Sequence, residues 1–135
     1  MFSITSRLKF NRIFKPVNET HCRYRVVLGS AGSGKSVNVA QDFILKLSDT
    51  KYTGANLLVI RKSEGTNRYS TFAELQAVIF RMCGEYWEDF WIINSSRLMI
   101  TSKITGNSII FRGVNDKKQR EKLKSITFPK GKLVW

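Results

Sequence analysis

The residues best suited to chemistry in this chain are Gly29-Ser30-Ala31-Gly32-Ser33-Gly34-Lys35-Ser36. They match the phosphate-binding pattern G-x-x-x-x-G-K-[ST] at every specified position. Glycines let the backbone bend tightly and turn its N–H groups toward an anion, because no Cβ obstructs either movement. The pattern predicts a loop that binds the phosphates of a nucleoside triphosphate. A Gly/Ser turn that merely links two elements is the simpler alternative.

Two side chains at the end of this loop have separate predicted roles. The ammonium of Lys35 can reach the β- and γ-phosphates, and the hydroxyl of Ser36 can join a Mg²⁺ shell made of phosphate oxygens and water. We therefore predict ATP and Mg²⁺ as cofactors and the residues from Gly29 to Ser36 as the nucleotide-binding set. Lys35 is the predicted catalytic cation and Ser36 the predicted metal ligand.

A loop of this kind should lie between a strand and a helix. Arg23 to Leu28 is continuously apolar at its end, which predicts a strand buried on both faces. Val37 to Leu47 has apolar residues at helical spacing, and Leu57-Leu58-Val59-Ile60 predicts a second buried strand. This strand–helix–strand order predicts an α/β fold, a P-loop NTPase-type three-layer structure with a mainly parallel central sheet.

Three further elements are expected along the chain. Thr71-Phe72-Ala73-Glu74 has the T-x-x-E form of a capping box, so a helix should begin near Thr71 and end at Gly84. Residues 97–101 and 108–112 should form a hairpin with Gly106-Asn107 in its turn. A third buried strand should begin at Leu133-Val134.

The charge of the chain favours a polyanionic partner. Its 23 Lys and Arg outnumber 10 Asp and Glu, a net charge of +13. Nucleic acid is the first candidate for this partner, and an anionic membrane surface is the second. Residues 112–132 hold eight of these cations against two acids, and they could contact DNA, contact a neighbouring subunit, or form a solvated loop.

The cysteines and the hydropathy of the sequence indicate in which cellular compartment the chain is expected. Cys22 and Cys83 lie far apart, so the sequence indicates neither a metal site nor a disulfide framework. A reducing, cytoplasmic location fits this use of cysteine. No run of residues approaches the length of a membrane span.

An acidic strand end is missing from the predicted site. P-loop hydrolases usually carry Asp or Glu at the end of a second apolar strand, the Walker B element. Asp49 and Asp116 do not follow such a strand, and the run Leu133-Val134 stops at Trp135 before any acid. We therefore expect residues 1–22 to be a lead-in segment and 23–135 a partial ATPase domain, truncated before the Walker B acids. Such a chain should bind nucleotide without efficient hydrolysis.

The order of these features resembles the ATPase domain of the large terminase subunit of tailed bacteriophages. The branch is the PBSX-type one, related to defective prophages of Bacillus. The resemblance covers roughly residues 14–135 and depends on an ordered set of matches: the P-loop, Arg61-Lys62 after the second strand, Arg68 to Phe72, Ile104 to Gly113, and Lys122-Leu123-Lys124-Ser125 after Asp116.

This resemblance implies a viral DNA-packaging motor in the bacterial host cytoplasm. It implies double-stranded DNA, the terminase small subunit, the portal and other copies of the chain as partners, with no membrane. It places Arg61 near the nucleotide as a catalytic or coupling cation, although a surface cation is an equal alternative. Arg12 and Phe14 lie where members of the family could place a basic or aromatic side chain against adenine. For both residues, a purely structural role is the favoured alternative. The family's nuclease domain is absent from residues 1–135.

Other functions remain open at this point. A helicase-like or repair ATPase would share the P-loop and the basic charge. A small-molecule P-loop kinase fits the loop but not the charge. A non-catalytic remnant that only binds nucleotide or a partner protein is the third alternative.

Overall fold

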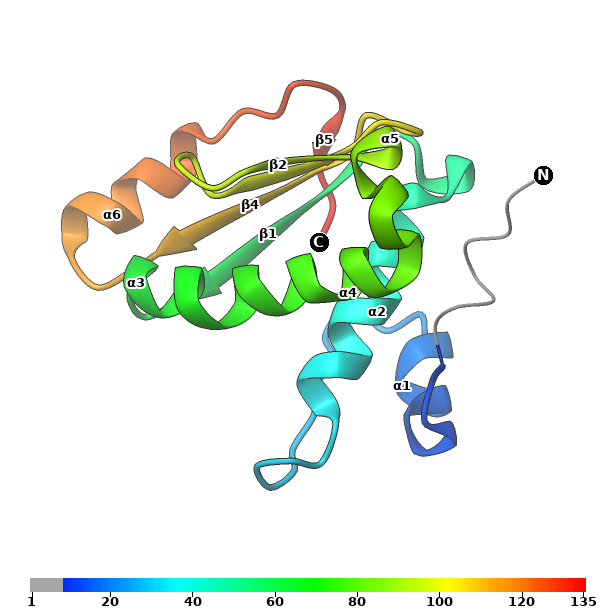
Figure 1. The fold of residues 1–135 in the computed structure, drawn as a ribbon. Coiled ribbons are helices and arrows are strands. Elements are labelled where there is room, and N and C mark those ends of the chain that lie inside the picture. Colours follow the sequence, from blue (N-terminus) through cyan, green and yellow to red (C-terminus); the bar gives the residue numbers. More distant parts are fainter. Residues whose placement is uncertain (1–8) are drawn as a thin grey trace.

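A computed structural model describes residues 9–135, and a five-stranded sheet lies at its centre (Figure 1). The strand order is β2-β3-β4-β1-β5. The strands are β1 Ala55–Arg61, β2 Trp91–Asn94, β3 Met99–Ser102, β4 Ser108–Gly113 and β5 Lys132–Leu133. β1 pairs in parallel with β4 and β5, whereas β3 pairs antiparallel with β2 and β4. The sheet is therefore mixed, and the prediction of a mainly parallel sheet was wrong.

Two longer helices cover one face of this sheet. The α-helices are α1 Lys15–Glu19, α2 Lys35–Ser48, α3 Glu64–Asn67, α4 Ala73–Cys83, α5 Trp87–Phe90 and α6 Lys117–Lys122. α2 and α4 share a core with the strands that includes Ile44, Leu47, Ile79, Ile109 and Phe111. None of the helices within residues 9–135 is both long enough and apolar enough to cross a membrane.

The opposite face of β1 is less covered. Side chains alternate along a strand, so Leu57 and Val59 face the helices while Ile60 faces away. Ile60 is 46% exposed. The second helical layer of the predicted three-layer fold is therefore not seen over this part of β1 in residues 9–135.

Several predicted elements are confirmed. The helix after the P-loop is α2, and the apolar run at residues 57–60 lies in β1. The predicted hairpin consists of β3 and β4. A strand, β5, does begin close to Leu133, but Leu133 is 49% exposed, so the prediction that this strand is buried was wrong. Gly84 follows α4 with φ of 60°, a conformation that ends a helix and suits glycine.

The predicted strand at Arg23–Leu28 was wrong. This segment forms neither a helix nor a strand, and Val26 and Leu28 are 84% and 90% exposed. A strand is stable only when a neighbour pairs with its backbone. The edge strands of the sheet are β2 and β5, and β5 offers only Lys132–Leu133 for pairing. The strand–helix–strand unit around the P-loop is consequently not formed.

The predicted helix start at Thr71 was also wrong. Helical backbone begins at α3, where the Ser63 hydroxyl accepts from the Thr66 amide, and continues through a π-helical turn at Arg68–Phe72 into α4. Thr71 donates its hydroxyl to the carbonyl of Asn67, 3.2 Å away. Because no helix terminus exists at Thr71, Glu74 has no cap to complete.

A buried asparagine ties β1 to both neighbouring strands. Asn56 is fully buried, and its Nδ2 donates to the carbonyls of Lys130 and Lys132 at 2.8 and 3.0 Å. Its Oδ1 accepts from the Ser108 amide at 2.7 Å. One side chain thus satisfies backbone groups at the start of β4 and around β5.

Candidate nucleotide-binding site

The P-loop is an exposed turn that leads directly into α2. Gly32 and Gly34 have φ of 76° and 86°, in the left-handed region that favours glycine. Gly34 is the residue before α2, and no side chain caps the helix there. The first amides of α2 therefore lack intrahelical partners and point along the positive end of the helix dipole. This arrangement suits an anion.

The ammonium of Lys35 lies against its own loop. Its Nζ is 2.5 Å from the Gly29 carbonyl oxygen, 2.9 Å from that of Ser30 and 3.0 Å from the Ser33 Oγ. A Cβ at Gly29 would lie 2.9 Å from Ser33 Oγ and 3.3 Å from Lys35 Nζ. Glycine at position 29 therefore leaves the space in which the lysine lies across the loop.

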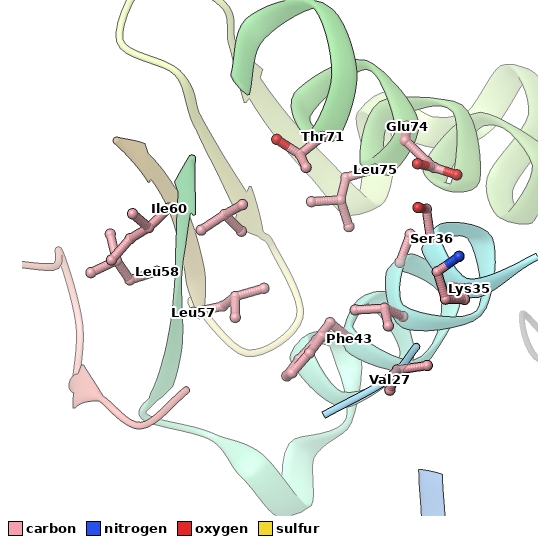
Figure 2. Close-up of a pocket in the computed structure, with 13 residues that line it drawn as sticks. Val27, Lys35, Ser36, Phe43, Leu57, Leu58, Ile60, Thr71, Glu74 and Leu75 are labelled. Carbon is pink, nitrogen blue, oxygen red and sulfur yellow. The ribbon is translucent and has the colours of Figure 1, made fainter. Parts of the chain in front are cut away.

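A pocket of about 410 Å³ lies between α2, β1 and α4 (Figure 2). Its size is in the range of small-molecule sites. Lys35 and Ser36 line it from the first turn of α2, and Thr71 and Glu74 line it from the helix that runs through α4. The other lining residues are apolar: Val27, Val39, Ala40, Phe43, Leu57, Leu58, Val59, Ile60 and Leu75. The side chains of Leu58 and Ile60 lie on the side of β1 away from α2, and that of Leu57 lies on the side toward it (Figure 2). Polar groups are therefore confined to one end of an otherwise apolar pocket.

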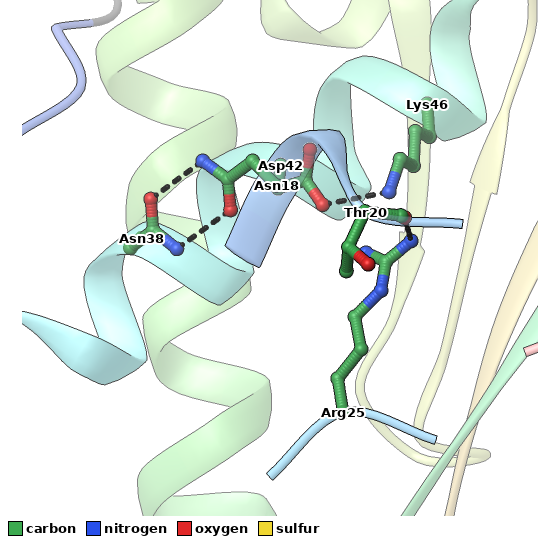
Figure 3. Close-up of polar contacts among 6 residues, drawn as sticks. All are labelled: Asn18, Thr20, Arg25, Asn38, Asp42 and Lys46. Carbon is green, nitrogen blue, oxygen red and sulfur yellow. Dashed lines mark hydrogen bonds and ion pairs between the residues drawn. The ribbon is translucent and has the colours of Figure 1, made fainter. Parts of the chain in front are cut away.

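A pair of hydrogen bonds ties α1, which precedes the loop, to α2 (Figure 3). Asn18 and Asn38 exchange two hydrogen bonds of 2.9 and 2.8 Å between α1 and α2. Arg25 donates to the carbonyl of Thr20. On α2 itself, the Lys46 ammonium lies 2.8 Å from the Asp42 carboxylate. The Asn18–Asn38 pair therefore joins the chain before the P-loop to α2, whereas the other two contacts lie within their own segments.

The other residues singled out from the sequence lie around the site. Arg61 is exposed at the carboxyl end of β1, one residue after Ile60, and does not line the pocket. Phe14 is only 8% exposed, and one of its ring carbons lies 3.6 Å from the Cβ position of Gly34. Phe14 therefore packs beneath the end of the P-loop. Arg12 is exposed.

Two aspartates that could have served as metal ligands instead act as helix caps. The Asp49 carboxylate accepts from the Lys51 amide at 3.0 Å, and that of Asp116 accepts from the Gln119 amide at 2.8 Å. Residues 9–135 contain no group of three or more His, Cys, Asp or Glu side chains that could hold a metal ion. Cys22 and Cys83 form no disulfide with each other.

Sequence reasoning missed two polar residues of the pocket, Thr71 and Glu74. Their places in a T-x-x-E pattern favoured a capping role for both, which the continuous helix excludes. The pattern of apolar residues predicted α4 but could not predict that α4 packs beside the first turn of α2. Glu74 enters the site only through that tertiary contact.

Comparison with known proteins decides the family. A family model described as phage terminase large subunit matches residues 21–135. The chain belongs to the phage terminase large subunit family. The match includes the P-loop and all five strands of this terminase chain.

A curated relative agrees with this assignment. The large terminase subunit of Bacillus phage SPP1 is 34% identical to the chain over 110 residues, which cover 81% of the chain. The aligned part amounts to 24% of that relative, so this terminase chain spans about a quarter of its length. No solved structure matches the chain.

Proposed function

We propose that this terminase chain is the ATP-binding part of a motor that packages viral DNA. The observation that carries the proposal is the P-loop at the start of α2, with Lys35 and Ser36 lining a pocket beside β1. Membership of the terminase family supports packaging as the process that ATP serves. ATP hydrolysis by the whole protein would drive DNA into the capsid.

The donors present at the loop fit a magnesium–triphosphate complex. The amides of the loop and of the first turn of α2 would bind phosphate oxygens, and Lys35 would donate to the β- and γ-phosphates. Ser36 would hold Mg²⁺, which screens the negative charge of the phosphates. Arg61, exposed at the end of β1, is proposed as a second cation that acts on the nucleotide or couples its state to movement.

We expect the 135-residue chain to bind ATP but to hydrolyse it far more slowly than a complete packaging ATPase. Asp49 and Asp116 are engaged as caps, so neither is available to activate water. Titration calorimetry with ATP would test binding, and phosphate release would test turnover. Absence of binding would contradict the proposed function. If the chain hydrolysed ATP as fast as a complete packaging ATPase, the expectation that it binds ATP without efficient hydrolysis would be wrong.

A basic surface around α6 is the proposed DNA contact. Lys117, Lys118, Arg120 and Lys122 lie on α6, and Lys124, Lys130 and Lys132 follow it, all exposed. The two ion pairs within residues 9–135, Lys15–Glu19 and Lys46–Asp42, involve none of them. Clustered, unpaired cations are the usual means of binding the phosphate backbone without reading the bases.

DNA affinity should fall steeply with salt and should depend on α6. The logarithm of the association constant changes by about 0.9 per contacted phosphate for each tenfold change in salt. The double variant Lys117→Ala/Lys118→Ala should therefore lower this slope by about one to two. Fluorescence anisotropy with duplex DNA at several salt concentrations measures it.

Lys51→Ala/Lys103→Ala is the matched control for the α6 variant. It removes the same charge from exposed positions outside residues 112–132. Equal slopes for the two double variants would show that net charge, rather than α6, attracts the DNA.

The partners of the whole protein are proposals from the family alone. They are the terminase small subunit, the portal and further copies of the subunit. A ring of subunits would place several P-loops around the DNA. Pull-down of the portal protein by the whole subunit would test the portal contact.

A further inference from the structure

Glu74 faces the phosphate-binding loop from a different helix. It lies in the first turn of α4 and lines the same pocket as Lys35 and Ser36. Figure 2 shows its carboxylate pointing toward the Ser36 hydroxyl, with the Lys35 ammonium on the same side of the pocket. Of the described residues that line this pocket, Glu74 is the single acid. A carboxylate thus lies beside the two side chains assigned to phosphate and metal.

The carboxylate of Glu74 has no structural partner in residues 9–135. Neither ion pair of the described chain includes it, and no hydrogen bond engages its oxygens. The helical backbone runs through this position, so the carboxylate does not cap a helix terminus. A partly buried charge is costly without a counter-charge. Its position therefore favours a ligand that brings positive charge into the pocket.

We propose that Glu74 is a further residue of the magnesium site. It accepts hydrogen bonds from water molecules of the Mg²⁺ that Ser36 and the nucleotide phosphates bind. Mg²⁺ in proteins keeps several waters and is held by one or two carboxylates together with substrate phosphates. Ser36 and Glu74 supply a hydroxyl and a carboxylate from facing elements. This inference rests on the proposed binding of ATP at Gly29–Ser36.

The charge of Glu74 has a measurable consequence for binding. Without a metal, the carboxylate and the triphosphate are both negative and repel each other at close range. With Mg²⁺ bound, both would be attracted to the cation. Glu74 therefore makes nucleotide affinity depend on the metal more strongly than the phosphates alone would.

The test compares ATP affinity with Mg²⁺ and with EDTA for three forms of the 135-residue chain. These are the unmodified chain, Glu74→Gln and the control Glu85→Gln. Glutamine keeps the size of glutamate and a similar helix propensity, so α4 should remain intact. Glu85 is exposed just beyond the other end of α4, and its substitution removes the same charge. Thermal unfolding of each form checks the fold.

We expect the ratio of the two dissociation constants to separate the variants. In Glu74→Gln the gain in affinity from Mg²⁺ should shrink by about tenfold, which corresponds to the loss of one charge-assisted contact. Metal-free ATP should bind the variant as well as, or better than, the unmodified chain. Glu85→Gln should keep the full gain.

Two outcomes would overturn the inference in different ways. If Glu74→Gln keeps the full Mg²⁺ gain, or weakens both affinities equally, Glu74 does not act through the metal while ATP binding stands. If the unmodified chain fails to bind ATP in either medium, the proposed function fails and this inference fails with it.

Discussion

Replacing Lys35 with alanine is expected to weaken ATP binding by about ten- to a hundred-fold. The substitution removes the cation nearest to the predicted phosphate position, and one charge-assisted hydrogen bond accounts for a loss of about this size. Within residues 9–135, the hydrogen bonds of the Lys35 ammonium go to oxygens of its own exposed loop, so the fold should persist. Calorimetric titration with Mg²⁺ and ATP measures the affinity, and circular dichroism checks the fold.

Lys103→Ala is the matched control for this prediction. Lys103 is equally cationic and is exposed in the turn between β3 and β4. That turn contacts the last residues of α2, because Thr105 donates to the carbonyl of Leu47. The P-loop lies at the first turn of the same helix, at the opposite end. If both alanine variants bound ATP equally, binding would reflect overall charge and the assignment of the loop would be wrong.

Replacing Asn56 with alanine is expected to lower the free energy of unfolding by roughly 2–4 kcal/mol. The change removes three hydrogen bonds and leaves the buried Ser108 amide without an acceptor. Each such bond contributes about 1 kcal/mol net, and an unsatisfied buried group adds a penalty. Urea unfolding measures the loss.

The same substitution should act most strongly on β5. Beyond Asn56, β5 is held mainly by backbone bonds, such as those from the Lys132 amide to Gly54 and from the Val134 amide to the Asn56 carbonyl. Hydrogen exchange should therefore accelerate first around residues 130–134. Asn115→Ala is the control, since Asn115 is exposed before α6. Equal losses for the two alanine variants would mean that Asn56 does not tie the strands together.

Local chemistry explains which parts of the structure could be predicted. The helix α2, the strand β1 and the β3–β4 hairpin follow from apolar spacing and turn residues within short windows. Lys35 and Ser36 were predicted as site residues for the same reason, and both line the pocket beside β1. Their positions relative to one another are set by a few consecutive residues.

The errors have a common physical origin in contacts between distant segments. Arg23–Leu28 has the composition of a buried strand, but strand formation depends on a partner edge that its own residues cannot supply. The strand β2 was not predicted, because four residues are too few to show a clear alternation of apolar and polar side chains. It is stabilised by its pairing with β3. Glu74 reaches the P-loop only because α4 packs beside α2.

The contacts of Lys35 have a consequence for the affinity of the proposed nucleotide site. Its ammonium already donates to the Gly29 and Ser30 carbonyls and to the Ser33 hydroxyl. Phosphate oxygens must compete with these internal acceptors. The loop is therefore in a closed conformation, and its hydrogen bonds to Lys35 must break before the ammonium can bind a phosphate. The observed affinity is then the intrinsic affinity multiplied by the fraction of loops already open. Any partner that loosens the loop would tighten ATP binding without touching the nucleotide.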